Sequence, residues 1–399
     1  MASTGLSPEY HRRIPFYRNV KTLAILAQVV FILLVGLLFW YLYSNMVEGM
    51  RRSNIPSGFD FLDDTAGFPI SEGIAYEPTD TYARAFVVGL VNTLRVSALG
   101  IVLATLLGIV IGIARLSSNW LLRTVASAYV QLIRNIPLIV LLIFIFVGVI
   151  LKLPRVRDAV GIEGVLLLSN RGLAMAWPRS SDSYNLWVPW LVGSLVVGVV
   201  VYEARRRYLK RVDRPGASLP WALLAMFGVI VLGAVITTLI SGRFPLVLDR
   251  PRPAGFNLVG GTALTGEFFA LLMGLTLYTA AFIAEIVRGG ILAVSKGQRE
   301  AARALGLTPA QTMRLVIFPQ ALRVIIPPMT NQYLNLTKNS SLGIAIGYFD
   351  LFNVSKTIFN QSGRTVPVIV LVMASYLSIS LLTSLIMNIY NRRMRVVER

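Results

Sequence analysis

Eight long apolar runs constrain the fold of this chain more than any other feature. A helix needs about 20 apolar residues to cross a hydrocarbon core of about 30 Å. Only 14% of the 399 residues are charged and 55% are hydrophobic, which leaves too few charges to cover a water-soluble fold. We therefore predict an all-α integral membrane protein with about eight spans, at 22–43, 86–114, 124–151, 186–202, 220–241, 264–287, 323–345 and 366–390.

Basic residues are divided unequally among the segments that connect these spans. If the N-terminus is cytoplasmic, the inner segments are strongly basic, whereas the outer segments hold equal numbers of acidic and basic residues. Lysine and arginine in short loops resist translocation, so this asymmetry sets the orientation. We read the net charge of +19 as the signature of a multi-pass protein in a lipid bilayer with both termini cytoplasmic. We expect no nucleic-acid partner.

Residue types that support catalysis are scarce. The chain has no cysteine and one histidine, His11, which excludes disulfide scaffolds, thiolate chemistry and metal sites that need a histidine pair. No G-x-x-x-x-G-K-[ST] phosphate loop occurs, so we expect any nucleotide site to lie on another polypeptide. We predict no enzymatic activity, no metal and no cofactor in this chain.

Composition shifts divide the chain into parts. Residues 1–85 hold the first span, which we interpret as an uncleaved anchor, and an outer loop with seven acidic residues. Residues 86–391 hold the other spans. Among these, the two spans within 186–241 lie between Pro-rich and Arg-rich connections, so we interpret them as an insertion. Residues 392–399 form a basic tail.

The cytoplasmic segment between the sixth and seventh spans predicts a helical hairpin. Residues 298–305 are all helix formers, and Gly306 supplies the left-handed position at which such a helix ends. Thr308 then matches an N-cap, with Pro309 in the first turn and Gln311 at the third position of a capping box. Two short helices joined by a tight turn follow from this pattern.

The second helix of this hairpin has an apolar face, formed by Met313, Val316 and Ile317. We expect Pro319 to end that helix before the chain returns to the bilayer. A basic helical hairpin outside the membrane is a surface suited to a protein partner.

The hairpin resembles the EAA loop of the membrane subunits of bacterial ABC importers. The resemblance rests on Glu300-Ala301-Ala302, on Gly306 ten residues before Val316, and on Pro319. It implies a type I ABC importer transmembrane fold with a five-helix core, to which the anchor and the two inserted helices are additions. It also implies that Glu300, Ala301, Ala302, Gly306 and Pro319 contact a cytoplasmic ATPase subunit, which binds ATP and Mg²⁺.

Further motifs resemble the polar-amino-acid permeases within that family. The resemblance covers about residues 86–391 and implies a path for L-amino acids in the bacterial inner membrane. It also implies a periplasmic amino-acid-binding protein and a second, different and smaller permease subunit as partners. The motifs are Gly89-Leu90-Val91-Asn92-Thr93-Leu94, Arg134-Asn135-Ile136-Pro137-Leu138, Glu285-Ile286-Val287-Arg288-Gly289-Gly290 and Lys338-Asn339-Ser340-Ser341-Leu342.

Polar residues are concentrated in the seventh span, between Thr330 and Ser341. Asn331, Asn335 and Lys338 recur at helical spacing and form one stripe, with Asn339 beside it. Such residues are costly in hydrocarbon unless they face a cavity or a partner. They are candidates for the substrate path, where a lysine holds a carboxylate and asparagines accept an ammonium group. Hydrogen bonds that hold the helices together are an equal alternative.

A carboxylate in the sixth span, Glu285, lies about one turn from its inner end. Arg288 at i+3, or Arg323, is a nearer partner than Lys338, so we predict a structural or gating ion pair of Glu285 and Arg288. The rival hypothesis is an ion-coupled secondary transporter that uses Glu285 with Lys338. That class shows inverted repeats and needs no docking hairpin.

Overall fold

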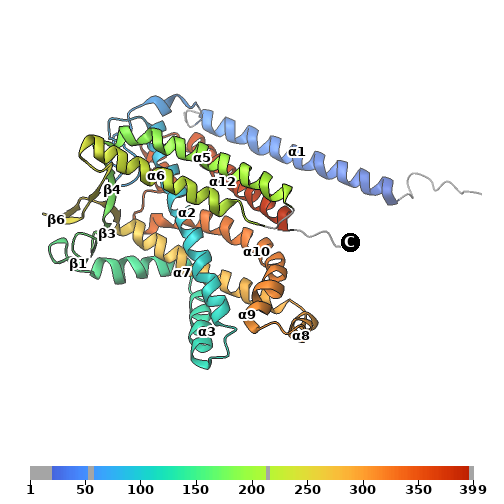
Figure 1. The fold of residues 1–399 in the computed structure, drawn as a ribbon. Helices are drawn as coiled ribbons and strands as arrows, with labels where there is room; N and C mark the ends of the chain where they lie inside the picture. Colours follow the sequence, from blue (N-terminus) through green and yellow to red (C-terminus); the bar gives the residue numbers. More distant parts are fainter. Residues whose placement is uncertain (1–19, 53–57, 213–215, 395–399) are drawn as a thin grey trace, which may run out of the picture.

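The computed structural model of this protein describes residues 20–52, 58–212 and 216–394. Helices dominate it, and Figure 1 shows most of them running between one end that carries small sheets and an opposite end that carries the start of α1 and the end of α12. The predicted class, a helical integral membrane protein, is confirmed. Within these described ranges, six helices are long and apolar enough to cross a bilayer: α1 (Val20–Arg52), α2 (Tyr82–Ala114), α5 (Tyr184–Arg211), α6 (Leu219–Ser241), α7 (Gly266–Leu292) and α12 (Thr365–Met394).

The predicted third span, 124–151, is not one straight helix. Helix α3 (Trp120–Arg134) and the segment that begins with α4 (Leu138–Ile143) meet at an angle of 107°. Pro137 causes the break, because proline has no backbone N–H and disfavours helical geometry in the residue before it. Beyond α4 the chain continues through a π-helical turn, Phe144–Val149, and a 3₁₀ turn, Ile150–Lys152.

The predicted seventh span corresponds to α10 (Phe318–Asn339), which is too polar to count with the six apolar helices. A 3₁₀ segment, Ser340–Ile346, follows it. Helix α11 (Leu351–Ser362) was not predicted, and it packs against α2 and α12.

Helices α2 and α7 form the centre of the molecule. Gly108 and Gly112 of α2 bring the two backbones together, because a Cβ at Gly108 would lie 2.6 Å from Ile283 Cγ2 and one at Gly112 would lie 2.8 Å from the Ala284 carbonyl oxygen. The fully buried side chains of α7 include Phe268, Leu271, Leu275 and Ile283. A small-residue seam on α2 therefore holds the core together.

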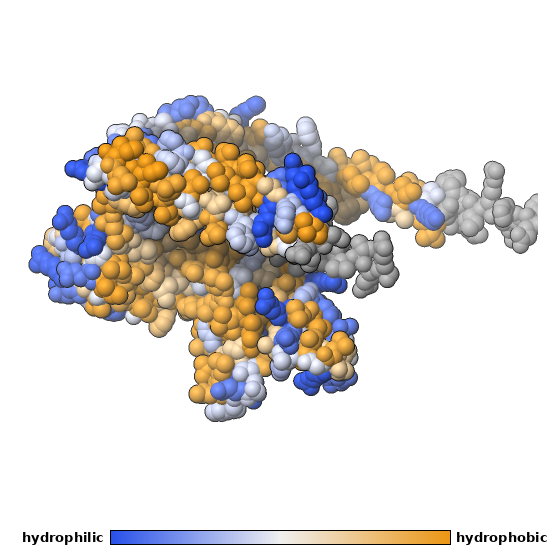
Figure 2. All heavy atoms as spheres, in the orientation of Figure 1, coloured by the Kyte–Doolittle hydropathy of each residue, from blue (hydrophilic) through white to orange (hydrophobic). Residues whose placement is uncertain are grey.

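Helices α5 and α6 pack mainly against each other. The Trp187 indole N–H donates to the Ile230 carbonyl at 3.0 Å, and a Cβ at Gly233 would meet Trp190 at 2.4 Å. Their outer surfaces are apolar, as Figure 2 shows. The pair is thus a helical hairpin beside the core.

The connections on either side of this hairpin form small antiparallel sheets that the sequence did not predict. The first sheet has the order β1-β2-β3-β8, with two residues, Asn170 and Arg171, between β2 and β3. Its last strand leads directly into α7. Figure 2 shows hydrophilic residues gathered at this end of the molecule. The strands are β1 (Val160–Ile162), β2 (Leu166–Ser169), β3 (Gly172–Met175), β4 (Trp177–Ser180) with β5 (Leu246–Asp249), β6 (Arg252–Ala254) with β7 (Asn257–Val259), and β8 (Thr262–Thr265).

Candidate functional site

The predicted hairpin exists, as α8 (Lys296–Ala304) and α9 (Pro309–Thr312). Gly306 has φ +74°, and the amides of Gly306 and Leu307 donate to the carbonyls of Arg303 and Ala302. These two bonds are the Schellman motif that ends a helix at a left-handed glycine. The predicted turn is confirmed.

The capping box that begins α9 is also confirmed. The side chain of Thr308 accepts from the Gln311 amide at 3.3 Å, and the Gln311 side chain accepts from the Thr308 amide at 2.9 Å. Each end of the turn is therefore fixed by its own backbone and side-chain bonds, without help from a partner.

One face of the hairpin packs on the protein and the other faces outward. Ala302 is buried, and Arg299 donates to the carbonyl of Ile291 at 2.8 Å, which holds α8 against the end of α7. Glu300 and Ala301 are exposed. Leu305 is 79% exposed, although a leucine gains free energy by burial. The outward face therefore combines a carboxylate with apolar groups, as a docking surface does.

The expectation that Pro319 ends the second helix is wrong. Met313–Ile317 forms a π-helical turn, and Pro319 lies in the first turn of α10, so the chain stays helical from α9 into α10. A proline is tolerated there because the π-helical turn before it has already left the i→i−4 hydrogen-bond pattern, so Pro319 interrupts no regular α-helical ladder. Ile317 is the buried member of the predicted apolar face, whereas Met313 is 36% exposed.

The polar stripe of α10 faces away from the rest of the subunit. Asn331, Asn335 and Lys338 are all exposed, and Asn339 is half-buried. Among the described residues, none of these four side chains has a hydrogen-bond or ion-pair partner. Bonds within this subunit therefore do not account for the stripe.

Other polar residues of the same span are bonded to their own helix. The hydroxyl of Thr337 donates to the carbonyl of Tyr333 at 3.0 Å, and that of Ser340 donates to the carbonyl of Thr337 at 2.8 Å. In the described part of the chain, the side chains of the stripe and of Gln332 are thus left to meet water, substrate or a partner.

A cavity of about 470 Å³ adjoins the inner part of the stripe, between α10 and α12. Its polar side chains from α12 recur at i, i+4 and i+7, a pattern that was visible in the sequence but was not singled out. It is lined by Pro327, Thr330, Asn331, Leu381, Ser384, Leu385, Met387, Asn388 and Asn391.

Glu285 lies among three arginines. Arg288 Nη2 lies 2.5 Å from Glu285 Oε1, Arg115 bonds Oε2, and Arg134 Nη1 lies 4.0 Å from Oε2. Arg134 also stacks over Phe282, at 5.2 Å from the ring centroid. The predicted partner Arg288 is therefore in place, and neither Arg323 nor Lys338 is within ion-pair distance in the described part of the chain.

Sequence reasoning did not identify Arg115 and Arg134 as partners of Glu285, although Arg134 begins one of the motifs named above. Arg115 directly follows the last residue of α2, and Arg134 lies in the last turn of α3, just before the chain bends toward α4. For Arg115 the available signal was its place at the predicted inner end of the second span, close to the predicted depth of Glu285. For Arg134 no such signal was present in the sequence, because the predicted straight third span places it farther from the inner end than Glu285. Because three helices contribute arginines to one carboxylate, the cluster joins α2, α3 and α7.

A second buried polar cluster joins α2 to the chain that enters α11. Asn92 of α2 is fully buried, and its side chain donates to the carbonyls of Glu72 and Phe349 at 3.1 and 2.9 Å. The hydroxyl of Thr93 accepts from the Leu351 amide at 2.9 Å. The motif Gly89–Leu94 thus positions the chain where it enters α11.

Asp350 caps α11 in the same cluster and was also missed. It is fully buried, accepts from the Asn353 amide at 2.9 Å, and accepts from the Tyr376 hydroxyl of α12 at 3.3 Å. An aspartate before an apolar helical run is an N-cap pattern, which was the available signal.

Glu72, in the acidic outer segment, ties that segment to α7. Its carboxylate accepts from the Thr265 amide at 3.3 Å and from the Thr265 hydroxyl at 2.9 Å. Burial raises the pKa of Glu72, although these two bonds oppose the rise. In the described residues no group of three His, Cys, Asp or Glu side chains is arranged to hold a metal ion.

Comparison with known proteins yields consistent matches. The sequence pattern of the family described as "Binding-protein-dependent transport system inner membrane component" matches residues 104–396. The chain is 44% identical, over 92% of its length and 91% of the relative, to the general L-amino acid transport system permease protein AapQ of Rhizobium johnstonii. It is 45% identical, over 92% of both chains, to the putative amino-acid ABC transporter permease protein YhdX of Escherichia coli.

A third relative and a solved structure extend these matches. The glutamate/glutamine/aspartate/asparagine transport system permease protein BztB of Rhodobacter capsulatus is 40% identical over 95% of both chains. A crystal structure of an amino acid ABC transporter with histidines is 23% identical, covers 78% of this chain and 95% of its own, and has a TM-score of 0.46.

Proposed function

The chain belongs to the family of binding-protein-dependent transport system inner membrane components, and from this membership we propose that it forms the translocation path for L-amino acids in an ABC importer. It is a multi-pass membrane permease of that family. The proposed orientation has both termini in the cytoplasm, in agreement with the basic inner segments.

The observation that carries the proposed coupling is the hairpin of α8 and α9. It is fixed by its own caps, yet it exposes Glu300, Ala301 and Leu305 to solvent. A pre-ordered surface loses little conformational entropy when a partner binds. In our proposal a cytoplasmic ATPase subunit docks there, binds ATP and Mg²⁺, and supplies the energy that this chain has no phosphate loop to provide.

The proposed path follows the stripe of α10. Asn331, Asn335 and Lys338 are exposed in the single subunit, which is expected if they line a path completed by a second permease. Lysine at one end suits a substrate carboxylate, and asparagine oxygens suit its ammonium group. We propose that the second permease is different and smaller, and that a periplasmic amino-acid-binding protein delivers the substrate to the end that carries the sheets.

The arrangement around Glu285 bears on the ion-coupled alternative. A coupling carboxylate must release its cation during the cycle, whereas Glu285 is engaged by Arg115 and Arg288. It has no contact with Lys338 within ion-pair distance in the part of the chain that the structure describes. In our proposal the cluster is structural or gating and carries no coupling ion.

Uptake in proteoliposomes with a catalytically inactive ATPase partner tests this function. We expect concentrative uptake of L-amino acids to stop, and Glu300→Lys to lower substrate-stimulated ATP hydrolysis because it reverses a charge at the docking surface. Glu163→Lys, an exposed residue of the outer sheet region, is the matched control. Persistent uptake with the inactive ATPase would instead support the ion-coupled transporter.

A further inference from the structure

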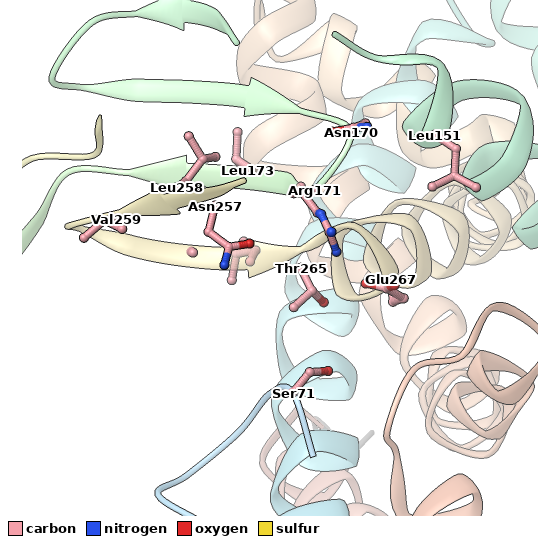
Figure 3. A pocket seen from close by; sticks show the side chains of 13 residues that line it. Ser71, Leu151, Asn170, Arg171, Leu173, Asn257, Leu258, Val259, Thr265 and Glu267 are labelled. Atoms are coloured by element: carbon pink, nitrogen blue, oxygen red, sulfur yellow. The ribbon is translucent and has the colours of Figure 1, made fainter. Parts of the chain in front are cut away.

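A cavity of about 750 Å³ opens at the end of the molecule that carries the sheets, beside the start of α7 (Figure 3). This volume lies within the range of small-molecule sites. Its walls come from the four-stranded sheet, from β7, from the outer segment and from the first turn of α7. The lining residues are Ser71, Leu151, Asn170, Arg171, Gly172, Leu173, Asn257, Leu258, Val259, Ala263, Leu264, Thr265 and Glu267.

The cavity holds one cationic and one anionic side chain, Arg171 and Glu267. Figure 3 shows both beside the start of α7. Within residues 20–52, 58–212 and 216–394, neither has an ion-pair partner within 4.0 Å, so they are not paired with each other. Because the guanidinium of Arg171 and the carboxylate of Glu267 line the same cavity without forming an ion pair, a ligand with one negative and one positive group could bind both.

The backbone fixes where the two charges lie. Arg171 stands in the two-residue turn between β2 and β3, and Gly172 follows it with φ +119°. A Cβ at Gly172 would lie 2.1 Å from the Leu264 carbonyl oxygen, so the turn is held tightly against β8. Glu267 is in the first turn of α7, which Thr265 caps. Both charges are therefore placed by ordered elements.

We propose that this cavity binds the zwitterionic backbone of an α-amino acid, with the α-carboxylate on the Arg171 guanidinium and the ammonium group on the Glu267 carboxylate. A guanidinium binds a carboxylate through two parallel hydrogen bonds, which fixes the ligand's direction. Leu173 and Leu258 offer apolar contact to the side chain of the amino acid, and Asn257 offers an amide. The choice of an amino acid as the ligand rests on the proposed function. In this proposal the substrate binds at the cavity before it enters the path along α10.

Cysteine protection tests this site directly, because the chain has no cysteine of its own. Ser71→Cys places a thiol on the cavity wall, and Ser180→Cys, at another exposed serine that lies in β4, is the control outside it. The assembled transporter is reconstituted with cysteine-free partner subunits, without ATP or binding protein, and is labelled with a membrane-impermeant maleimide. L-glutamine is the probe. At ten times its dissociation constant it should slow labelling at Ser71→Cys about 10-fold, because about a tenth of the sites remain empty, and should leave Ser180→Cys unchanged.

Charge requirements separate this site from a nonspecific cleft. N-acetyl-L-glutamine lacks the ammonium group and glutamine α-amide lacks the carboxylate, so neither should protect. Arg171→Met and Glu267→Gln should abolish protection by L-glutamine while leaving the ligand-free labelling rates at both cysteines unchanged, which shows that the region is folded. Arg171→Lys should restore part of the protection.

Two results would overturn the proposal: no slowing by L-glutamine, or equal slowing by the two singly charged analogues. The same proteoliposomes, supplied with ATPase and binding protein, are assayed for amino-acid uptake. If uptake occurs without protection, the cavity site fails and the proposed function stands. If the wild-type assembly takes up no amino acid, the proposed function itself fails.

Discussion

Replacing Gly306 with alanine should loosen the hairpin of α8 and α9 by an amount set by backbone conformation alone. Gly306 has φ +74°, and a Cβ built there meets no heavy atom within 4 Å. The steric cost is therefore restricted to the left-handed conformation, about 1–2 kcal/mol for a residue with a side chain. That free energy corresponds to about a 5- to 30-fold increase in the opened population of the turn.

Hydrogen exchange of the assembled transporter measures this opening. The amide of Leu307, which donates to the Ala302 carbonyl across the turn, should exchange faster by that factor in Gly306→Ala. Gly297→Ala is the matched control in the same hairpin. It also meets no atom within 4 Å but has no left-handed conformation, so alanine should leave the hairpin unchanged or stabilise it by up to about 1 kcal/mol.

Coupling to ATP hydrolysis should decrease in the variants whose hairpin is loosened. Gly306→Ala should lower substrate-stimulated ATP hydrolysis, Gly297→Ala should not, and Gly306→Asn should lie between wild type and Gly306→Ala because asparagine tolerates the left-handed region. Equal exchange at Leu307 in wild type and Gly306→Ala would refute the reasoning, as would equal acceleration in Gly297→Ala.

Three further perturbations address the membrane core and the outer segment. Gly108→Ala places a Cβ 2.6 Å from Ile283 Cγ2, so overpacking of about 1–3 kcal/mol should lower the thermal unfolding midpoint. Gly36→Ala in α1, where a Cβ meets nothing within 4 Å, is the control and should not lower it. Equal midpoints for Gly108→Ala and Gly36→Ala would count against the seam between α2 and α7. Glu285→Gln should destabilise the protein by about 2 kcal/mol, because charged hydrogen bonds to two guanidinium groups are weakened; an unchanged midpoint would mean that the cluster is not structural. Burial raises the pKa of Glu72 above its ordinary 4.5. Between pH 4.5 and the raised pKa, the folded protein therefore binds more protons than the unfolded chain, and the free energy of unfolding falls as the pH rises through this interval. Glu72→Gln should remove this fall, and parallel midpoint-against-pH curves for the two proteins would contradict it.

Local patterns predicted the parts of the structure that depend on local bonds. The turn at Gly306 and the capping box at Thr308 arise from bonds between residues at most five apart, so their residues identify them in the sequence. The apolar helices were likewise predictable, because the thickness of the bilayer fixes their length.

Tertiary contacts account for most of what sequence patterns did not reveal. Arg115 and Glu285 are 170 residues apart, and no periodicity relates them. The strands at the outer end are three or four residues long, too short for alternation to stand out from a loop. Pro137 and Pro319 were both visible, yet Pro137 breaks a helix and Pro319 lies within a continuous helical run, since the effect of a proline depends on the hydrogen-bond pattern of the turn before it.

The helical continuity between the hairpin and α10 has a mechanical consequence. From Pro309 to Asn339 the backbone is helical without a break, but Pro327 and Pro328 lie inside α10, so the run is jointed and is not a straight rod. A displacement imposed at the exposed tip can reach Asn331, Asn335 and Lys338 only through two joints, the loosely wound turn at Met313–Ile317 and the pair of prolines. Stiffening either joint would change how far the stripe moves when the hairpin is displaced, without altering a residue of the hairpin or of the stripe.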